Sequence, residues 1–189
     1  MSTTFQQNLD EHRALFARLE SLAAPVAQAA ELMAKTLSSG RKIMLCGNGG
    51  SAADSQHLAA EFTGRFIKDR RPLAALALST DTSALTCISN DYSFDEVFSR
   101  QVLGLGVPGD CLLAISTSGN SRNVLRAVEA ARGLKMRTIG LLGRDGGTLA
   151  KLCDLAIIVP SATTARIQEA HIMIGHTLCG MIEESLQLA

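Results

Sequence analysis

Residues 42–57 read KIMLCGNGGSAADSQH, an apolar run followed by a glycine-rich turn and a segment of helical character. Four more apolar runs follow, at residues 73–78, 111–116, 136–142 and 155–160. Near-continuous apolarity is typical of strands buried on both faces, and the intervening segments are long enough for crossover helices. The pattern predicts an α/β fold, a three-layer sandwich with a central five-stranded parallel sheet.

Helical patterns flank this predicted sheet, and the whole chain, 1–189, is interpreted as a single domain. Within residues 1–39, apolar side chains from Phe5 to Val26 recur at spacings of four and three, and a second stripe ends at Gly40. Pro25 is expected to break or kink the first helix. Because such a seam suits helix pairing, we expect residues 1–39 to serve in oligomerisation, with packing on their own domain as the alternative. A last helix is predicted over residues 164–187.

Composition limits the classes of partner. The chain has 18 basic and 18 acidic residues, a formal net charge of zero, and 47% hydrophobic residues. The apolar content predicts a globular protein with a hydrophobic core. The chain lacks the clustered cations that binding to nucleic acid or to anionic membranes requires. No apolar stretch reaches the length of a membrane span, and the start MSTTFQQNLDEHR lacks the pattern of a secretory signal, which predicts a cytoplasmic location. The five cysteines are widely spaced and are predicted to be reduced core residues.

The glycine-rich turn GNGGSAADSQH (47–57) directly follows the first predicted strand. At the carboxyl end of a parallel strand, such a turn with a helix N-terminus favours an anion site. The letters also satisfy G-x-G-x-x-A, so a dinucleotide site is a second interpretation, with Asp81 as its ribose ligand. A glycine turn without any ligand is the third.

A second turn, Ser116-Thr117-Ser118-Gly119-Asn120-Ser121, follows the strand predicted at 111–116 and precedes a helix over about 122–132. Its four hydroxyl groups can donate to a phosphate without any cation. A single serine would be explained as a helix cap, but a cap needs only one hydroxyl. The excess favours a phosphate monoester as the ligand.

His57 and Glu61 lie four residues apart on the helix that leaves the glycine-rich turn, and hence on one face of it. Their spacing suits metal ligation or an acid/base pair, although such pairs are commonly only solvated. The final helix supplies Gln168, His171 and His176. His171 falls on the apolar stripe and is expected in the core. Gln168 and His176 are about 12 Å apart along the helix, so they share one ligand only by leaning together.

Four segments together resemble the sugar isomerase (SIS) domain family: GNGGSAADSQHLAAEF, STDTSALTCISNDYSF, STSGNS and TARIQEAHIMIGH. Within that family they resemble the bacterial branch that acts on seven-carbon sugar phosphates. The resemblance implies a SIS-fold homotetramer that converts D-sedoheptulose 7-phosphate to D-glycero-D-manno-heptose 7-phosphate through an enediol. This reaction is the first step of ADP-heptose and lipopolysaccharide core biosynthesis.

The resemblance also implies site residues and one zinc ion per subunit. Zinc would be held by His57, Glu61, Gln168 and His176, and Glu61 and His176 would be the catalytic acid/base pair, in an order that stays open. The implied substrate contacts are Asn48, Gly49, Gly50, Ser51, Glu61, Arg65, Asn90, Asp91, Ser116, Thr117, Ser118, Ser121 and Gln168.

A second, non-catalytic branch of the family looks similar across the same loops and binds the replication initiator protein DnaA. In that branch the positions matching Glu61 and His176 lose the acid and the imidazole, whereas this sequence keeps both. An isomerase is therefore the preferred interpretation, and a binding module for DnaA is the alternative.

Overall fold

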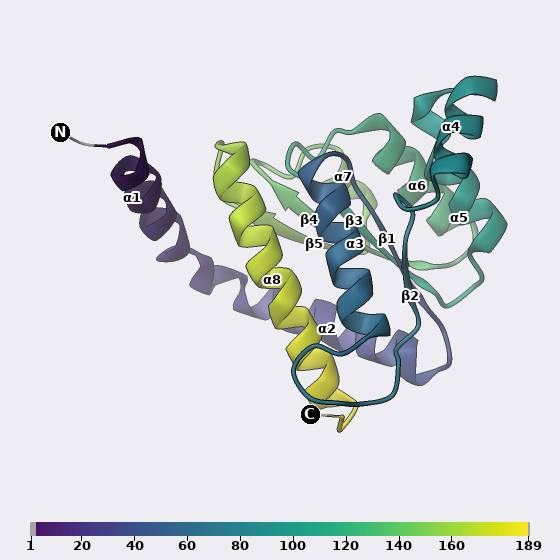
Figure 1. Cartoon of the computed structure of the whole chain (residues 1–189), viewed down its shortest axis with the longest axis horizontal. Coiled ribbons are helices and arrows are strands. Elements are labelled where there is room, and N and C mark those ends of the chain that lie inside the picture. Colours follow the sequence, from purple (N-terminus) through teal and green to yellow (C-terminus); the bar gives the residue numbers. More distant parts are fainter. Residues whose placement is uncertain (1–2, 189) are drawn as a thin grey trace.

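The computed structural model describes residues 3–188 (Figure 1). One parallel sheet contains five strands in the order β2-β1-β3-β4-β5, and each strand falls within or close to a predicted apolar run. The strands are β1 (Ile43–Cys46), β2 (Ala75–Ala77), β3 (Cys111–Ser116), β4 (Arg137–Gly143) and β5 (Leu155–Val159).

Helices cover both faces of the sheet, which confirms the three-layer sandwich (Figure 1). Successive side chains of a strand point to opposite faces, so Leu45 and Leu113 lie in one core while Met44 and Leu112 lie in the other. Three long helices pack on the first core: α2 (Ala23–Ser38), α3 (Gly50–Thr63) and α8 (Thr164–Ser185). The second core includes side chains of α5 (Ser99–Leu105), α6 (Arg122–Gly133) and α7 (Leu149–Leu152).

The N-terminal region is helical as predicted, but its break lies elsewhere. Helix α1 (Thr4–Phe16) ends well before Pro25, and the short 3₁₀ helix η1 (Leu19–Leu22) leads into α2. Pro25 lies in the first turn of α2, where a missing N–H removes no intrahelical hydrogen bond. The prediction of a break at Pro25 was therefore wrong. Leu15 is the buried residue of α1, which stands beside α8 at one end of the molecule (Figure 1).

All five cysteines are free thiols. Cys46, Cys111 and Cys179 are buried and Cys153 is half-buried, as predicted for core residues. Cys87 is the exception, because it is exposed on α4 (Thr82–Asp91), a helix that has no buried residue. Within residues 3–188 no helix combines the length and apolarity needed to cross a membrane.

The sheet order places both predicted ligand turns at one position. From β1 the chain continues to β2 on one side, whereas from β3 it continues to β4 on the other, although β1 and β3 are direct neighbours. In open α/β sheets, ligands bind beyond the carboxyl ends of strands at such a reversal of direction. The turns after β1 and β3 both begin there.

Candidate active site

The turn after β3 holds its hydroxyl groups together. Ser116 Oγ lies 3.1 Å from Ser121 Oγ and 3.4 Å from Ser118 Oγ, and it accepts a hydrogen bond from Gly119 N. Ser121 is the N-cap residue of α6, yet among the described residues no side chain caps this helix. The cap explanation therefore does not account for Ser121. The hydroxyls line a small polar turn at a helix N-terminus, which suits a phosphate.

The turn after β3, residues 116–121, is called the serine turn below. It packs tightly on a neighbouring loop, and this close approach is possible because residue 119 is a glycine. Its φ is +65°, and a Cβ at this position would collide with the backbone of Gly146. The carboxamide of Asn120 accepts hydrogen bonds from Thr148 N and Thr148 Oγ1 at 3.0 and 2.9 Å. The loop after β4 thus contacts the serine turn through Gly119 and Asn120 and holds it in place.

The glycine-rich turn after β1 is joined to the serine turn by a pair of amides. Asn48 and Asn123 exchange two side-chain hydrogen bonds, each of 2.8 Å. Asn123 is buried in the first turn of α6, so the pair fixes Asn48 relative to the predicted phosphate loop. Gln168 of α8 lies against Gly50, where a Cβ would collide with its amide. Gly50 is needed here because the helix start and the Gln168 side chain approach so closely.

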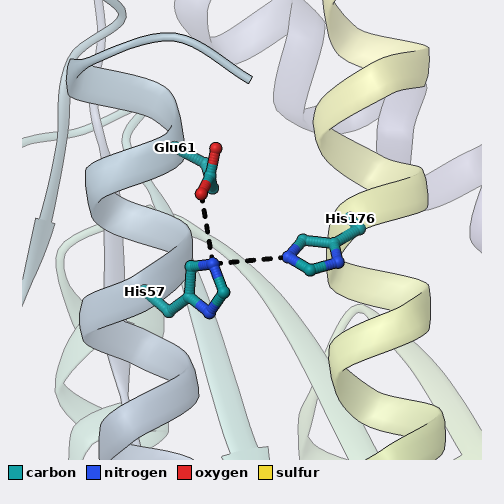
Figure 2. A group of neighbouring side chains, drawn as sticks. All are labelled: His57, Glu61 and His176. Carbon is teal, nitrogen blue, oxygen red and sulfur yellow. Dashed lines mark hydrogen bonds and ion pairs between the residues drawn. The ribbon is translucent and has the colours of Figure 1, made fainter. Parts of the chain in front are cut away.

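His57, Glu61 and His176 converge between α3 and α8, as Figure 2 shows. His57 Nε2 lies 3.1 Å from Glu61 Oε1 and 3.4 Å from His176 Nε2. One possible ligand atom from each residue lies within 4.8 Å of the other two. The side chain of Glu61 is 22% exposed and that of His57 is 48% exposed, so solvent reaches the cluster.

The donor set of this cluster fits a metal ion. Two imidazole nitrogens and a carboxylate oxygen are the ligands that Zn²⁺ takes at catalytic sites, where a further position stays open for water or substrate. His57 Nε2 faces both the carboxylate and the second imidazole, although one ring nitrogen carries at most one proton. A cation held among these three atoms resolves that conflict. The residues present therefore fit a bound metal ion.

Two neighbours of the cluster were not found from the sequence. Asp54 precedes His57 by one helical turn, and burial raises the pKa of its carboxyl while His57 and His176 partly offset this effect. Its Oδ2 is buried and finds no hydrogen-bond partner among residues 3–188. The ring of Phe66 lies 5.5 Å from that of His176. The spacing of Asp54 and His57 was the available signal, since residues three apart share a helix face.

Other predicted residues have contacts elsewhere. Asn90 donates to Asp91 at 2.8 Å at the end of α4, and both are exposed, while the guanidinium of Arg65 donates to the carbonyl of Ile67. Within residues 3–188, none of these three side chains forms a hydrogen bond or ion pair with the cluster or with the turn at residues 116–121. Asp81, the ribose ligand in the dinucleotide interpretation, caps α4 by accepting from Ala84 N at 2.9 Å. That cap gives Asp81 an ordinary structural role.

His171 lies in the core, as predicted. Its side chain is buried, its Nε2 lies 3.0 Å from the carbonyl oxygen of Leu142 at the end of β4, and burial lowers its pKa to about 4. The imidazole is therefore neutral at pH 7. His176, on another side of the same helix, is the histidine that reaches the cluster.

The SIS domain family model matches residues 7–143 of the chain. Similar curated proteins include the phosphoheptose isomerases of Nitratiruptor sp., 58% identical over 95% of this chain and 97% of the relative, and of Rhodospirillum rubrum, 56% identical over 90% and 91%. Among solved structures, the phosphoheptose isomerase of Neisseria gonorrhoeae is 51% identical with a TM-score of 0.86, covering 96% of this chain and all of the relative. The phosphoheptose isomerase of Francisella tularensis is 38% identical with a TM-score of 0.85, covering 94% and 98%.

Proposed function

Because this chain belongs to the SIS domain family, and within it to the phosphoheptose isomerases, we propose that it converts D-sedoheptulose 7-phosphate to D-glycero-D-manno-heptose 7-phosphate. It is a sugar-phosphate isomerase. The observation that carries the reaction is the convergence of Glu61, His57 and His176 between two helices. The DnaA-binding alternative has no support among the curated relatives reported above, which are named phosphoheptose isomerases.

The proposed chemistry needs one base and one acid. An aldose–ketose isomerisation moves a proton between adjacent carbons and another between their oxygens. Glu61 takes the proton from one carbon and returns it to the neighbouring carbon. The imidazole of His176 transfers the second proton between the oxygens on these two carbons. Glu61 is only partly exposed, which limits exchange of its proton with bulk water.

The proposal includes zinc as the metal, held by His57, Glu61, His176 and Gln168. When bound, zinc supplies Lewis-acid polarisation of the substrate carbonyl. Gln168 rests against Gly50 near the first turn of α3, so its amide links the glycine-rich turn to the helix that carries His176. This contact supports Gln168 as a substrate residue at the glycine-rich turn, and its place in the proposed zinc set rests on the family resemblance alone.

The serine turn is proposed to hold the phosphate. The phosphate of this substrate is at the opposite end of the carbon chain from the reacting carbons. His57 lies seven residues beyond Gly50, which is about 10 Å along α3 from the turns at the carboxyl ends of the strands. A phosphate anchored at Ser116, Ser118 and Ser121 therefore suits a long sugar whose carbonyl must reach a cluster at some distance.

The proposal further assigns a homotetramer, a cytoplasmic location and the first step of ADP-heptose and lipopolysaccharide core biosynthesis. Exposed apolar side chains support assembly: Phe5 of α1 is 73% exposed, and Tyr92 and Phe94 after α4 are 58% and 59% exposed. The exposure of Asn90 and Asp91 beside them is consistent with a substrate contact made across a subunit interface.

Incubation of the purified protein with D-sedoheptulose 7-phosphate, followed by NMR with and without added zinc, tests the proposal. Formation of the aldose, stimulated by zinc, is expected. Absence of aldose under both conditions would reject the isomerase. Binding of purified DnaA by the same inactive preparation would then favour the alternative.

A further inference from the structure

Arg70 and Glu183 form a buried ion pair beside the cluster. Arg70 lies in the loop after α3 and Glu183 lies near the end of α8, and their side chains are 2% and 3% exposed. Arg70 Nε donates to Glu183 Oε1 at 2.6 Å. Within residues 3–188, it is the only ion pair whose two side chains are both less than 10% exposed.

The remaining nitrogens of Arg70 hold the end of α3. Nη2 donates to the carbonyl oxygen of Glu61 at 2.7 Å, and Nη1 donates to those of Phe62 and Gly64 at 2.8 and 2.9 Å. The last carbonyls of a helix lack intrahelical partners, and a cation there is favoured by the helix dipole. Arg70 thus caps the turn of α3 that carries the Glu61 side chain.

Glu183 connects the same arginine to the helix of His176. Glu183 and His176 are seven positions apart on α8, so they lie on nearly the same face, about 10 Å apart along the helix axis. Glu183 Oε1 also accepts from Phe66 N at 3.3 Å, and the ring of Phe66 packs near that of His176. The ion pair therefore contacts both helices and the loop that borders the cluster.

We propose that Arg70 and Glu183 are positioning residues, a buried clamp that sets α3 against α8 and so holds His57, Glu61 and His176 at metal-binding distance. Apolar contacts alone permit two helices to slide, whereas a planar guanidinium whose hydrogen bonds include four to Glu183 and the end of α3 defines one arrangement. This inference rests on the proposed function, because it concerns the geometry of that reaction's site.

The chain offers a matched control for a purely structural ion pair. Lys42 Nζ lies 2.5 Å from Asp110 Oδ2, and the side chain of Asp110 is 1% exposed. Asp110 also accepts from the backbone N–H groups of Lys42 and Val107. This pair joins the amino-terminal ends of β1 and β3, at the sheet edge opposite the turns.

The test compares Arg70→Lys and Glu183→Gln with Asp110→Asn, all measured in the full-length protein below its melting transition. Three quantities are recorded: the Kd for Co²⁺ with its visible absorption spectrum, kcat, and KM for D-sedoheptulose 7-phosphate. We expect Arg70→Lys and Glu183→Gln to weaken Co²⁺ binding and lower kcat by about tenfold or more, with an altered spectrum and a KM within about threefold of wild type. Asp110→Asn lowers Tm but changes Kd and kcat less than about twofold.

The clamp is rejected if Arg70→Lys and Glu183→Gln match Asp110→Asn in Kd, spectrum and kcat while losing a similar Tm. Arg70→Lys keeps the charge, so it remains informative if Glu183→Gln does not fold. Failure of the proposed function is distinguishable, because the wild-type protein itself would then lack Co²⁺ binding or turnover. If wild type isomerises without binding Co²⁺, the metal is rejected and kcat decides the clamp. If wild type neither binds Co²⁺ nor turns over, the clamp is rejected with the function.

Discussion

The serine turn and the His57–Glu61–His176 cluster differ in how the chain builds them. Ser116, Ser118 and Ser121 belong to one continuous turn, and their contacts span at most five residues. His57 and His176 are separated by 119 residues and meet only because α3 packs against α8. A local turn keeps its shape whenever the strand before it and the helix after it form. A cluster between helices depends on how precisely those helices are placed.

This difference predicts where substitutions act. Substitutions in the serine turn should weaken binding of the substrate phosphate and so raise KM. Substitutions at the cluster should lower kcat.

Glu61→Gln should lower kcat by about 10² to 10⁴-fold, because it removes a positioned base while keeping the shape of the side chain. Steady-state kinetics and circular dichroism check this, with Glu129→Gln on the exposed surface of α6 as the control for loss of a carboxylate. A Glu61→Gln enzyme with a near-native kcat would remove Glu61 from the mechanism.

His171 should make stability depend on pH, since it anchors α8 at Leu142, the β4 residue that pairs with Ser116. Its folded-state pKa of about 4 lies below the ordinary value of 6.5, so the unfolded chain takes up the proton first as the pH falls. The free energy of unfolding should drop by about 3 kcal/mol between pH 6.5 and 4 from this group.

Urea unfolding of wild type and His171→Asn across that pH range measures this contribution as a difference. The variant should be less stable at pH 7 and should lose this part of the pH dependence, while keeping most of its activity. His176→Asn is the companion variant, expected to abolish isomerisation and weaken metal binding with little loss of stability. If His171→Asn is instead the stable and inactive variant, the roles of the two histidines are reversed.

Removal of the proposed metal should loosen the cluster without dissociating the proposed homotetramer. A ligand present at about 100 times its Kd stabilises the folded state by about 2.7 kcal/mol, so a chelator should lower Tm by several degrees. Calorimetry measures Tm, and sedimentation in the same buffers measures the mass. Conversion to monomers with chelator would show instead that the metal joins subunits.

Ser118→Ala should have the smallest effect, raising KM by about tenfold, because one hydroxyl to a phosphate oxygen contributes about 1.5 kcal/mol. Sedoheptulose without the phosphate is the matched control, and its weak turnover should be unaffected by the substitution. Equal KM values for wild type and variant on the phosphorylated sugar would contradict the assignment of the phosphate to this turn.

The strands, the final helix and both turns could be predicted because each is encoded in a continuous stretch. The run CLLAIS followed by TSGNS indicates a buried strand and a polar turn whatever the rest of the chain does. His171 was assigned to the core for the same reason, since its position on the apolar stripe is a property of one helix. The error at Pro25 was also local: proline is excluded from a helix interior but accepted in a first turn, and the letters permit both.

The sequence alone therefore determined the succession of strands and helices along the chain, the two turns, and the residue types available for chemistry. Tertiary structure alone decided that Asn123 would orient Asn48, that Asp54 and Phe66 would border the cluster, and that Arg70 would cap α3 against Glu183. These contacts join positions from 6 to more than 100 residues apart or depend on burial. The physical reason is that hydrogen-bond partners and desolvation are properties of packed surfaces, and no period or spacing within one segment specifies which surface it will meet.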